Sequence, residues 1–286
     1  MDALANLGDT AYTLIVLLSC GALGGFLAGL IGVGGGIIFV PALCIVFIDV
    51  FGVDPGSAIV IATATSLVCM IPTSITSACS HHRRGNVDVS IIRQWGICML
   101  IGVTAGALVS SFYGGQWLGF IFGTVVLANS LNTLLRANAP PFRDRLPPAR
   151  VQHVIALCIS FFSVMLGIGG GTLTVPVLNA CGVPPHRSVG TSAGVTLFVC
   201  IPGVTVLLLT TLLSSNTPPG APLGTYGYIN LLAALCVIPT SMWFAPRGVA
   251  VGQRISPVNL KRLFALFLLL VAVKMLHQSS VYYGLI

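Results

Sequence analysis

The chain has 286 residues, of which 56% are hydrophobic and only 7% are charged, and its mean hydropathy is +1.00. A soluble domain carries about 25% charged residues, so this composition excludes a water-exposed globular surface and a soluble catalytic domain. The net charge is +7. We interpret the excess Lys and Arg residues as loop cations that set the orientation of a membrane protein, and we expect no nucleic-acid partner.

Ten apolar segments follow one another along the chain, and we expect a helix in each. They cover residues 11–31, 37–51, 57–79, 90–112, 117–136, 151–168, 172–181, 187–212, 226–246 and 260–283. At about 1.5 Å per residue, segment 172–181 reaches only about 15 Å, half of the hydrocarbon thickness. The predicted fold is an all-α integral membrane protein with about 8–10 transmembrane or re-entrant helices.

A glycine-rich motif occurs twice in the chain. Gly32-Val33-Gly34-Gly35-Gly36 is followed by Pro41, and Gly167-Ile168-Gly169-Gly170-Gly171, 135 residues later, is followed by Pro176. Glycine lets the backbone leave a helix, and proline cannot continue the hydrogen-bond ladder. We expect a broken helix at each copy, with the two prolines at the breaks or gates, which is typical of a transporter.

The duplicated motif predicts two homologous halves. Residues 1–136 form the first repeat and residues 151–286 the second, each with five helical elements, and residues 137–150 form a cytoplasmic linker. Because five elements is an odd number, the second half is expected to be inverted relative to the first. Inverted repeats with broken helices indicate alternating access.

Charge placement supports one orientation. If the loops near residues 80–92, 137–150, 182–187 and 247–260 are cytoplasmic, twelve of the thirteen Lys and Arg residues fall in or beside them. They are Arg83, Arg84, Arg93, Arg136, Arg143, Arg145, Arg150, Arg187, Arg247, Arg254, Lys261 and Arg262. The positive-inside rule then predicts a multi-pass protein of the inner (plasma) membrane with both termini external.

The glycine motifs are candidate anion sites. A helix that starts inside the membrane presents free N–H groups and the positive end of its dipole, and nearby hydroxyls can complete the coordination of an oxyanion. The candidate substrate-binding residues are Gly34, Gly35, Gly36, Thr65, Ser66, Gly169, Gly170, Gly171, Thr172, Thr191 and Ser192. A dinucleotide fingerprint is rejected because no βαβ unit fits these apolar runs.

Several other classes are disfavoured. No Asp, Glu or Arg lies near the middle of any predicted span, whereas proton pumps and cation carriers usually keep one there. The nine cysteines are scattered and form no CxxC, so they are interpreted as apolar packing residues. No catalytic constellation can be assembled at one depth. We expect no enzyme activity, no metal and no cofactor.

These residues resemble the sulfite exporter TauE/SafE family. The resemblance is carried by residues 24–36 with Pro41, residues 167–176, Ala-Thr-Ala-Thr-Ser-Leu at 62–67 and Val-Gly-Thr-Ser-Ala at 189–193. It covers residues from about 20 to 275. It implies a membrane transporter that exports sulfite or a small organosulfonate such as sulfoacetate.

The predicted function is therefore export of a small sulfur-containing anion by a secondary transporter. Two alternatives stay open: an uptake carrier for thiosulfate or another sulfur species that uses the cysteines, and a non-transporting membrane scaffold. The expected partners are a small anionic substrate, the lipid bilayer and a coupling ion, either proton or sodium. The GxxxG stripe at Gly21, Gly25 and Gly29 permits a homodimer and equally serves internal packing.

Overall fold

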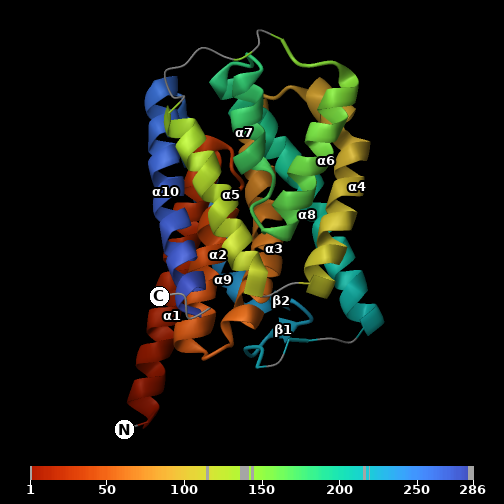
Figure 1. Cartoon of the computed structure of the whole chain (residues 1–286). Helices are drawn as coiled ribbons and strands as arrows, with labels where there is room; N and C mark the ends of the chain where they lie inside the picture. Colours follow the sequence, from red (N-terminus) through yellow and green to blue (C-terminus); the bar gives the residue numbers. More distant parts are fainter. Residues whose placement is uncertain are drawn as a thin grey trace.

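The protein is a bundle of helices, seen here in a computed structural model (Figure 1). The structure describes residues 2–113, 116–135, 142, 145–214, 217–218 and 220–282. The elements of the first half are α1 (Asp2–Ile31), α2 (Gly36–Ile45), the π-helical turn η1 (Val46–Val50), α3 (Pro55–His82), α4 (Val89–Tyr113) and α5 (Gln116–Leu135). Those of the second half are α6 (Ala149–Met165), α7 (Gly171–Ala180), α8 (Pro185–Ser214), β1 (Thr225–Tyr226), β2 (Ile229–Asn230), α9 (Leu231–Gly252) and α10 (Pro257–Tyr282).

Within the part of the chain that the structure describes, five of these helices have stretches long and apolar enough to cross a membrane. The stretches are Ala11–Ile31, Pro55–His82, Val89–Ser111, Pro185–Leu213 and Leu231–Gly252. Shorter apolar helical stretches cover Gly36–Val50, Phe120–Leu135, Ala149–Met165 and Ala265–His277. The prediction of an all-α, multi-pass membrane protein is confirmed.

Two helix starts are set by side chains that cap them. Asp54 Oδ2 accepts from the N–H groups of Gly56 at 2.9 Å and Ser57 at 3.2 Å, and Pro55 occupies the first position of α3, where its missing N–H costs nothing. Asn230 Oδ1 accepts from the Ala233 N–H at 2.8 Å and begins α9 in the same way.

The prediction of a helix from residue 226 is wrong at its start. Residues Thr225–Tyr226 and Ile229–Asn230 form a short antiparallel hairpin, with Thr225 opposite Asn230, and α9 follows it as far as Gly252. The reason is local: Gly224 and Gly227 have φ of 79° and 59°, a left-handed backbone that ends helical propagation.

The two short helices re-enter the bundle from opposite ends (Figure 1). Phe47 and Phe51 follow α2 and line one cavity together with Thr13 and Asn230. The helix α2 therefore runs to the end of the bundle at which α1 begins and the hairpin lies. We name this end the hairpin end. Conversely, Phe142 N–H donates to the Ala180 carbonyl at 2.9 Å, so α7 returns to the end where α6 begins, which we name the linker end. Neither short helix spans by itself.

Small residues let α1 pack closely on α9. A Cβ built on Gly25 would lie 2.5 Å from Ser241 Cα, and one on Gly29 would lie 2.8 Å from the Ala245 carbonyl carbon. Only glycine permits this approach of two helix backbones. The GxxxG stripe therefore faces the inside of this chain, where it serves internal packing.

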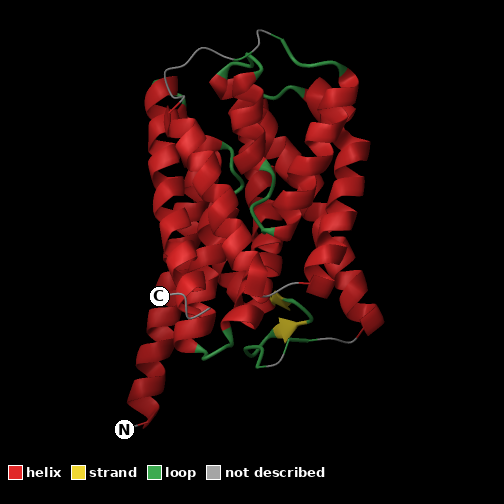
Figure 2. Cartoon of the chain, in the orientation of Figure 1, coloured by secondary structure: helices red, strands yellow, loops and turns green. Residues whose placement is uncertain are grey.

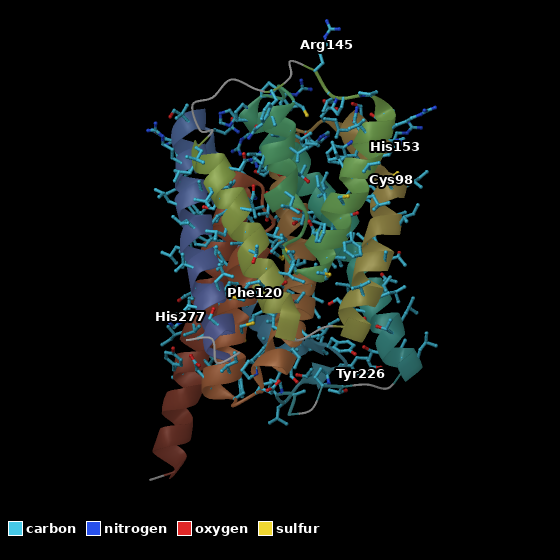
Figure 3. The ribbon with its side chains drawn as sticks, in the orientation of Figure 1. Cys98, Phe120, Arg145, His153, Tyr226 and His277 are labelled. Atoms are coloured by element: carbon cyan, nitrogen blue, oxygen red, sulfur yellow. The ribbon has the colours of Figure 1, made fainter. Side chains whose placement is uncertain are left out.

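Cations gather at the linker end of the bundle. Arg83 and Arg84 follow α3, Arg187 lies in the first turn of α8, and Arg254 follows α9, all exposed. Figure 3 shows Arg145 at the linker end and Tyr226 at the hairpin end. Half of the predicted linker, with Arg143, lies outside the described residues, and so does Arg136 just before it. The positive-inside rule predicts that the linker end faces the cytoplasm.

Thiol labelling tests this orientation. In a cysteine-free variant, Leu223→Cys places a thiol on a side chain that is 87% exposed at the hairpin end, and Arg254→Cys places one at the linker end. A membrane-impermeant maleimide added to intact cells should label the first and spare the second until the membrane is permeabilised. The reverse pattern would contradict the orientation.

Candidate functional site: a crossing of two glycine loops

Two irregular segments lie in the middle of the bundle, between helices (Figure 2). The first joins α1 to α2 at residues 32–35, and the second joins α6 to α7 at residues 166–170. Gly34 and Gly35 have φ of 78° and 85°, and Gly169 and Gly170 have φ of 73° and 78°. Residues with a Cβ rarely adopt this conformation, so the broken helices are where the motif predicts them.

The two loops touch each other through their backbones. A Cβ on Gly36 would meet the Gly167 carbonyl oxygen and lie 2.9 Å from Ile168 Cα, and one on Gly171 would meet the Gly32 carbonyl oxygen and lie 2.7 Å from Val33 Cα. Each helix therefore starts directly against the opposite loop. We call this arrangement the glycine crossing.

Met70 of α3 and Thr196 of α8 cover both loops. A Cβ on Gly34 would lie 2.7 Å from Thr196 Cγ2 and 3.1 Å from Met70 Sδ, and one on Gly169 would lie 2.6 Å from Met70 Sδ and 2.9 Å from Thr196 Cγ2. Both side chains are fully buried. Neither residue is among those predicted from the sequence, although Met70 and Thr196 each lie five positions after the first residue of a Thr-Ser pair.

Ser66 and Ser192 hold the loops in place. Ser66 Oγ donates toward the Gly167 carbonyl and the Thr63 carbonyl of its own helix, both at 2.8 Å. Ser192 Oγ donates toward the Gly32 and Val189 carbonyls, both at 2.7 Å. A hydroxyl has one proton, so each serine shares its proton between two backbone carbonyls. Neither has a proton left for an anion unless a loop contact breaks.

Thr65 and Thr191 are arranged differently. Thr65 Oγ1 accepts from the Asn230 backbone N–H, and Thr191 Oγ1 accepts from the Asp88 backbone N–H, both at 2.9 Å. Both threonines are fully buried, and within the described part of the chain neither hydroxyl has an acceptor for its own proton. These two hydroxyls retain the donor that an oxyanion requires.

Thr172 lies in the first turn of α7. Its side chain is fully buried, and Oγ1 has no hydrogen-bond partner among the described residues. Its carbonyl accepts from Asn129 Nδ2 of α5 at 2.8 Å. Pro176, four residues on, has no N–H to donate to that carbonyl, and Asn129 takes the place of the missing donor. Pro41 and Pro176 thus lie inside α2 and α7, whereas the breaks themselves are made by glycines.

Formal charge is absent from the buried interior of the described residues. The buried polar side chains there are Ser, Thr, Asn and Gln residues and His81, with no Asp, Glu, Lys or Arg among them. The positive potential at the glycine crossing comes from the N-termini of α2 and α7. Helix ends supply only partial charges, which are weaker than the full charge that a buried Arg would add.

The Asp88 carboxylate lies near the linker end of the bundle. Ser90 Oγ donates to Asp88 Oδ1 at 2.6 Å, and mainly for this reason the pKa of Asp88 is lowered. Arg187 Nη2 lies 3.5 Å from Asp88 Oδ2 on an exposed surface, where such pairs contribute little. The stabilisation from the lowered pKa is present above the unfolded value of about 3.9 and is lost as pH falls through the folded value.

In the described part of the chain, we looked for side chains that could bind a metal ion and at the state of the cysteines. It holds no group of three or more His, Cys, Asp or Glu side chains that could bind a metal ion. The nine cysteines are free thiols, and Cys20, Cys44, Cys69 and Cys200 are buried among apolar side chains.

An integral membrane protein with two broken helices whose N-termini meet inside the bundle has the architecture of a transporter. Comparison with known proteins agrees with this class. Residues 17–275 match the family described as "Sulfite exporter TauE/SafE", and the chain belongs to that family. No solved structure matches it.

Three curated relatives carry the description of a probable membrane transporter protein. The chain is 30% identical over 267 residues to one from Haemophilus influenzae, covering 92% of this chain and 98% of the relative. It is 28% identical to one from Methanocaldococcus jannaschii, covering 86% and 89%, and 24% identical to one from Bacillus subtilis, covering 93% and 98%. The family and these relatives are membrane transporters and not enzymes, and the chain is assigned to that class.

Adding one methyl group tests the close contact at the glycine crossing. Gly36→Ala and Gly171→Ala should each lower the thermal midpoint by several degrees and reduce transport, because the Cβ would meet the backbone of the opposite loop. Gly96→Ala in α4 is the matched control, since its Cβ would come no closer than 3.6 Å to Phe198. Equal midpoints for all three variants would contradict the contact.

Removing one serine hydroxyl tests the bonds that hold the loops. Ser66→Ala and Ser192→Ala should each cost about 1–3 kcal/mol of stability, because a buried carbonyl loses its donor. Ser111→Ala is the control, since that hydroxyl bonds only the Ala107 carbonyl of its own helix. Detergent-unfolding curves measure the difference, and a large loss in only one of the two serine variants would contradict their matching roles.

Proposed function

We propose that this transporter exports a small sulfur oxyanion, sulfite or an organosulfonate such as sulfoacetate, by alternating access. The family description names sulfite export, and the curated relatives name transport without a substrate. The support from this chain is physical: an interior with helix N-termini and hydroxyl donors suits an anion with several acceptor oxygens.

The observation that carries the proposal is the pair of helix starts at the glycine crossing. Gly36 begins α2 and Gly171 begins α7, each against the opposite loop. Among the described residues the N–H groups of Gly36, Ile37 and Thr172 have no backbone acceptor, whereas Gly171 N–H donates to the Gly169 carbonyl at 2.9 Å and Ile38 N–H to the Gly35 carbonyl at 2.9 Å. Two such ends at one buried place form an anion site of backbone donors, in which Gly34, Gly35, Gly169 and Gly170 leave the backbone uncovered.

Among the predicted hydroxyls, the proposal assigns two kinds of role. Thr65, Thr191 and Thr172 keep uncommitted protons and supply direct donors to the anion. Ser66 and Ser192 position the loops by bonding their carbonyls, so they act on the anion through the backbone.

The two halves are proposed to be an inverted repeat. Reciprocal contacts support it: Ser66 of the first half bonds a glycine carbonyl of the second, and Ser192 of the second bonds a glycine carbonyl of the first. α1 packs along α9, and α6 packs along α4 in the same manner, with Gly102 and Gly106 against Leu157 and Phe161.

Two contacts are proposed to act as gates on opposite sides of the crossing. Asn230 N–H bonds Thr65 toward the hairpin end, and Asp88 N–H bonds Thr191 toward the linker end. When one of these hydrogen bonds breaks, its threonine can bind the anion and the path to that end of the bundle opens. The hydrogen bond on the opposite side stays intact and keeps the other end closed. Alternation of the two contacts moves the anion between the ends.

Flux through proteoliposomes tests the substrate. Protein reconstituted into vesicles is offered sulfite, sulfoacetate, sulfate and thiosulfate, with imposed proton or sodium gradients. The proposal expects saturable flux of sulfite or sulfoacetate, accelerated by one of the gradients. Thiosulfate flux alone that disappears in a cysteine-free variant would favour the uptake alternative. If no sulfur anion is transported and none raises the melting temperature of the protein, the result would contradict the proposal and favour the scaffold alternative.

Threonine variants test the direct donors within the same assay. Thr65→Val and Thr191→Val keep the side-chain shape but remove a hydrogen bond to a charged group, so transport efficiency should fall about 10- to 100-fold. Thr205→Val is the control, because that exposed hydroxyl bonds only the Ile201 carbonyl of its own helix. Unchanged efficiency in both variants would remove the threonines from the site.

A further inference from the structure

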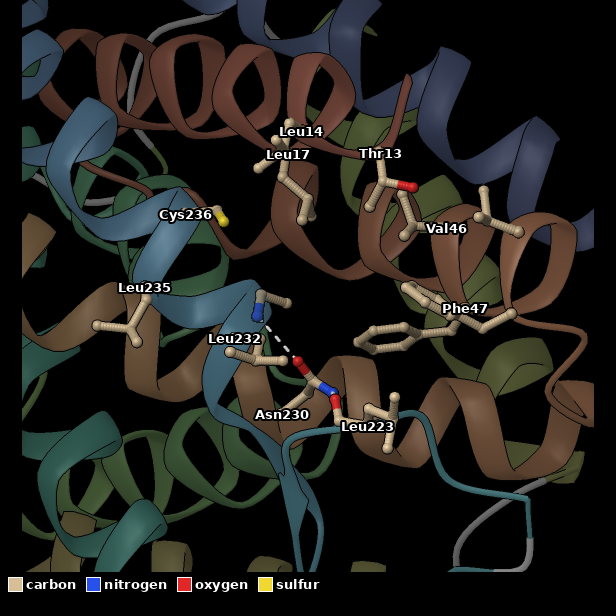
Figure 4. Close-up of a pocket in the computed structure, with 13 residues that line it drawn as sticks. Thr13, Leu14, Leu17, Val46, Phe47, Leu223, Asn230, Leu232, Leu235 and Cys236 are labelled. Carbon is tan, nitrogen blue, oxygen red and sulfur yellow. Dashed lines mark hydrogen bonds between the residues drawn. The ribbon is translucent and has the colours of Figure 1, made fainter. Parts of the chain in front are cut away.

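A cavity of about 560 Å³ lies at the hairpin end (Figure 4), and its lining includes no residue of the two glycine loops. α1 contributes Leu14 and Leu17 to its wall, η1 contributes Phe47, and the first turns of α9 contribute Leu235 and Cys236. Its volume is within the range of small-molecule sites.

The cavity begins where the close packing of α1 on α9 ends. Gly21 is the last glycine of the stripe toward this end, and a Cβ there would lie 2.5 Å from the Val237 carbonyl oxygen. One turn further along α1, Leu17 replaces glycine and faces the cavity together with Cys236. The helices no longer approach backbone to backbone, and a space opens between them.

Among the described residues, the wall has no charged side chain. Its most polar member, Asn230, is fully engaged: Oδ1 accepts from the Ala233 N–H, and Nδ2 donates to the Leu223 carbonyl at 3.1 Å and to Thr225 Oγ1 at 2.8 Å. Of the described wall residues, Thr13 alone adds a further hydroxyl, and burying an anion beside so few donors is strongly unfavourable. The cavity therefore does not suit the proposed substrate, and its occupant is apolar.

The rim of the cavity belongs to the membrane-facing surface. Leu14 is 44% exposed, Leu232 55% and Leu235 67%, and all three lie on the candidate membrane spans Ala11–Ile31 and Leu231–Gly252. Exposed leucines on a membrane span contact lipid, so the apolar molecules nearest to the opening are the acyl chains of the surrounding bilayer.

We propose that this cavity is a binding site for one acyl chain of a phospholipid from the leaflet at the hairpin end. The chain enters between Leu14 and Leu235 and packs on Leu17 and Phe47. The headgroup stays at the membrane surface near Leu223. This site is independent of which anion the protein moves.

Photo-crosslinking tests the site in the full-length protein. Vesicles contain phosphatidylcholine with a diazirine in the middle of one acyl chain, and mass spectrometry maps the adducts after illumination. Adducts on residues 13–17, 46–51 and 232–236 should exceed those on the segment of lipid-facing Ile97, 75% exposed, by about fivefold, the ratio that a preference of roughly 1 kcal/mol produces.

Matched variants distinguish the cavity from ordinary lipid contact. Cys236→Phe fills the cavity and should lower its adducts to the level at Ile97. Cys98→Phe changes an equally half-buried cysteine outside the cavity and should leave them unchanged. If Cys236→Phe does not fold, Leu14→Trp at the rim gives the same test. Adducts at the level of Ile97 in the unaltered protein, or adducts displaced by excess sulfite, would overturn the proposal.

Discussion

The structure depends on satisfying the backbone of two irregular loops in the middle of a membrane protein. No water is available in the hydrocarbon region to bond a free carbonyl, and a helix that stops there exposes several. Ser66 bonds the Gly167 carbonyl and Ser192 bonds the Gly32 carbonyl. Each bond runs from one half of the chain to the loop of the other, so each broken helix is held in part by the other half.

Glycine and the low charge of the interior follow from this arrangement. The loops can cross only if their backbones touch, and this requires Gly36 and Gly171 to lack a Cβ. Helix ends at the crossing provide positive potential without a buried cation, so an anion would be held by many weak donors. Weak, distributed binding suits a transporter, because the substrate must leave again.

Much of the fold could be predicted from the sequence, because hydropathy and the repeated glycine motif are local signals. Apart from the start of α9, the helices and the two breaks are where these signals indicate them. The roles of Ser66, Thr65 and Met70 could not be predicted, since their partners lie far along the chain: Ser66 and Gly167 are 101 residues apart. The hairpin before α9 was also missed, since Gly224 and Gly227 act through their positive φ, which an apolar pattern does not contain.

The protein has two different interior environments: helix N-termini and hydroxyls at the glycine crossing, and an apolar cavity at the hairpin end. The proposed function requires that the anion bind at the crossing. A crystal structure with selenite, a heavier analogue of sulfite with a strong anomalous signal, tests this most directly. The account predicts one anomalous peak within about 3 Å of the first N–H groups of α2 and α7, the distance of an N–H···O bond. A peak elsewhere in the bundle, or none at saturating selenite, would contradict it.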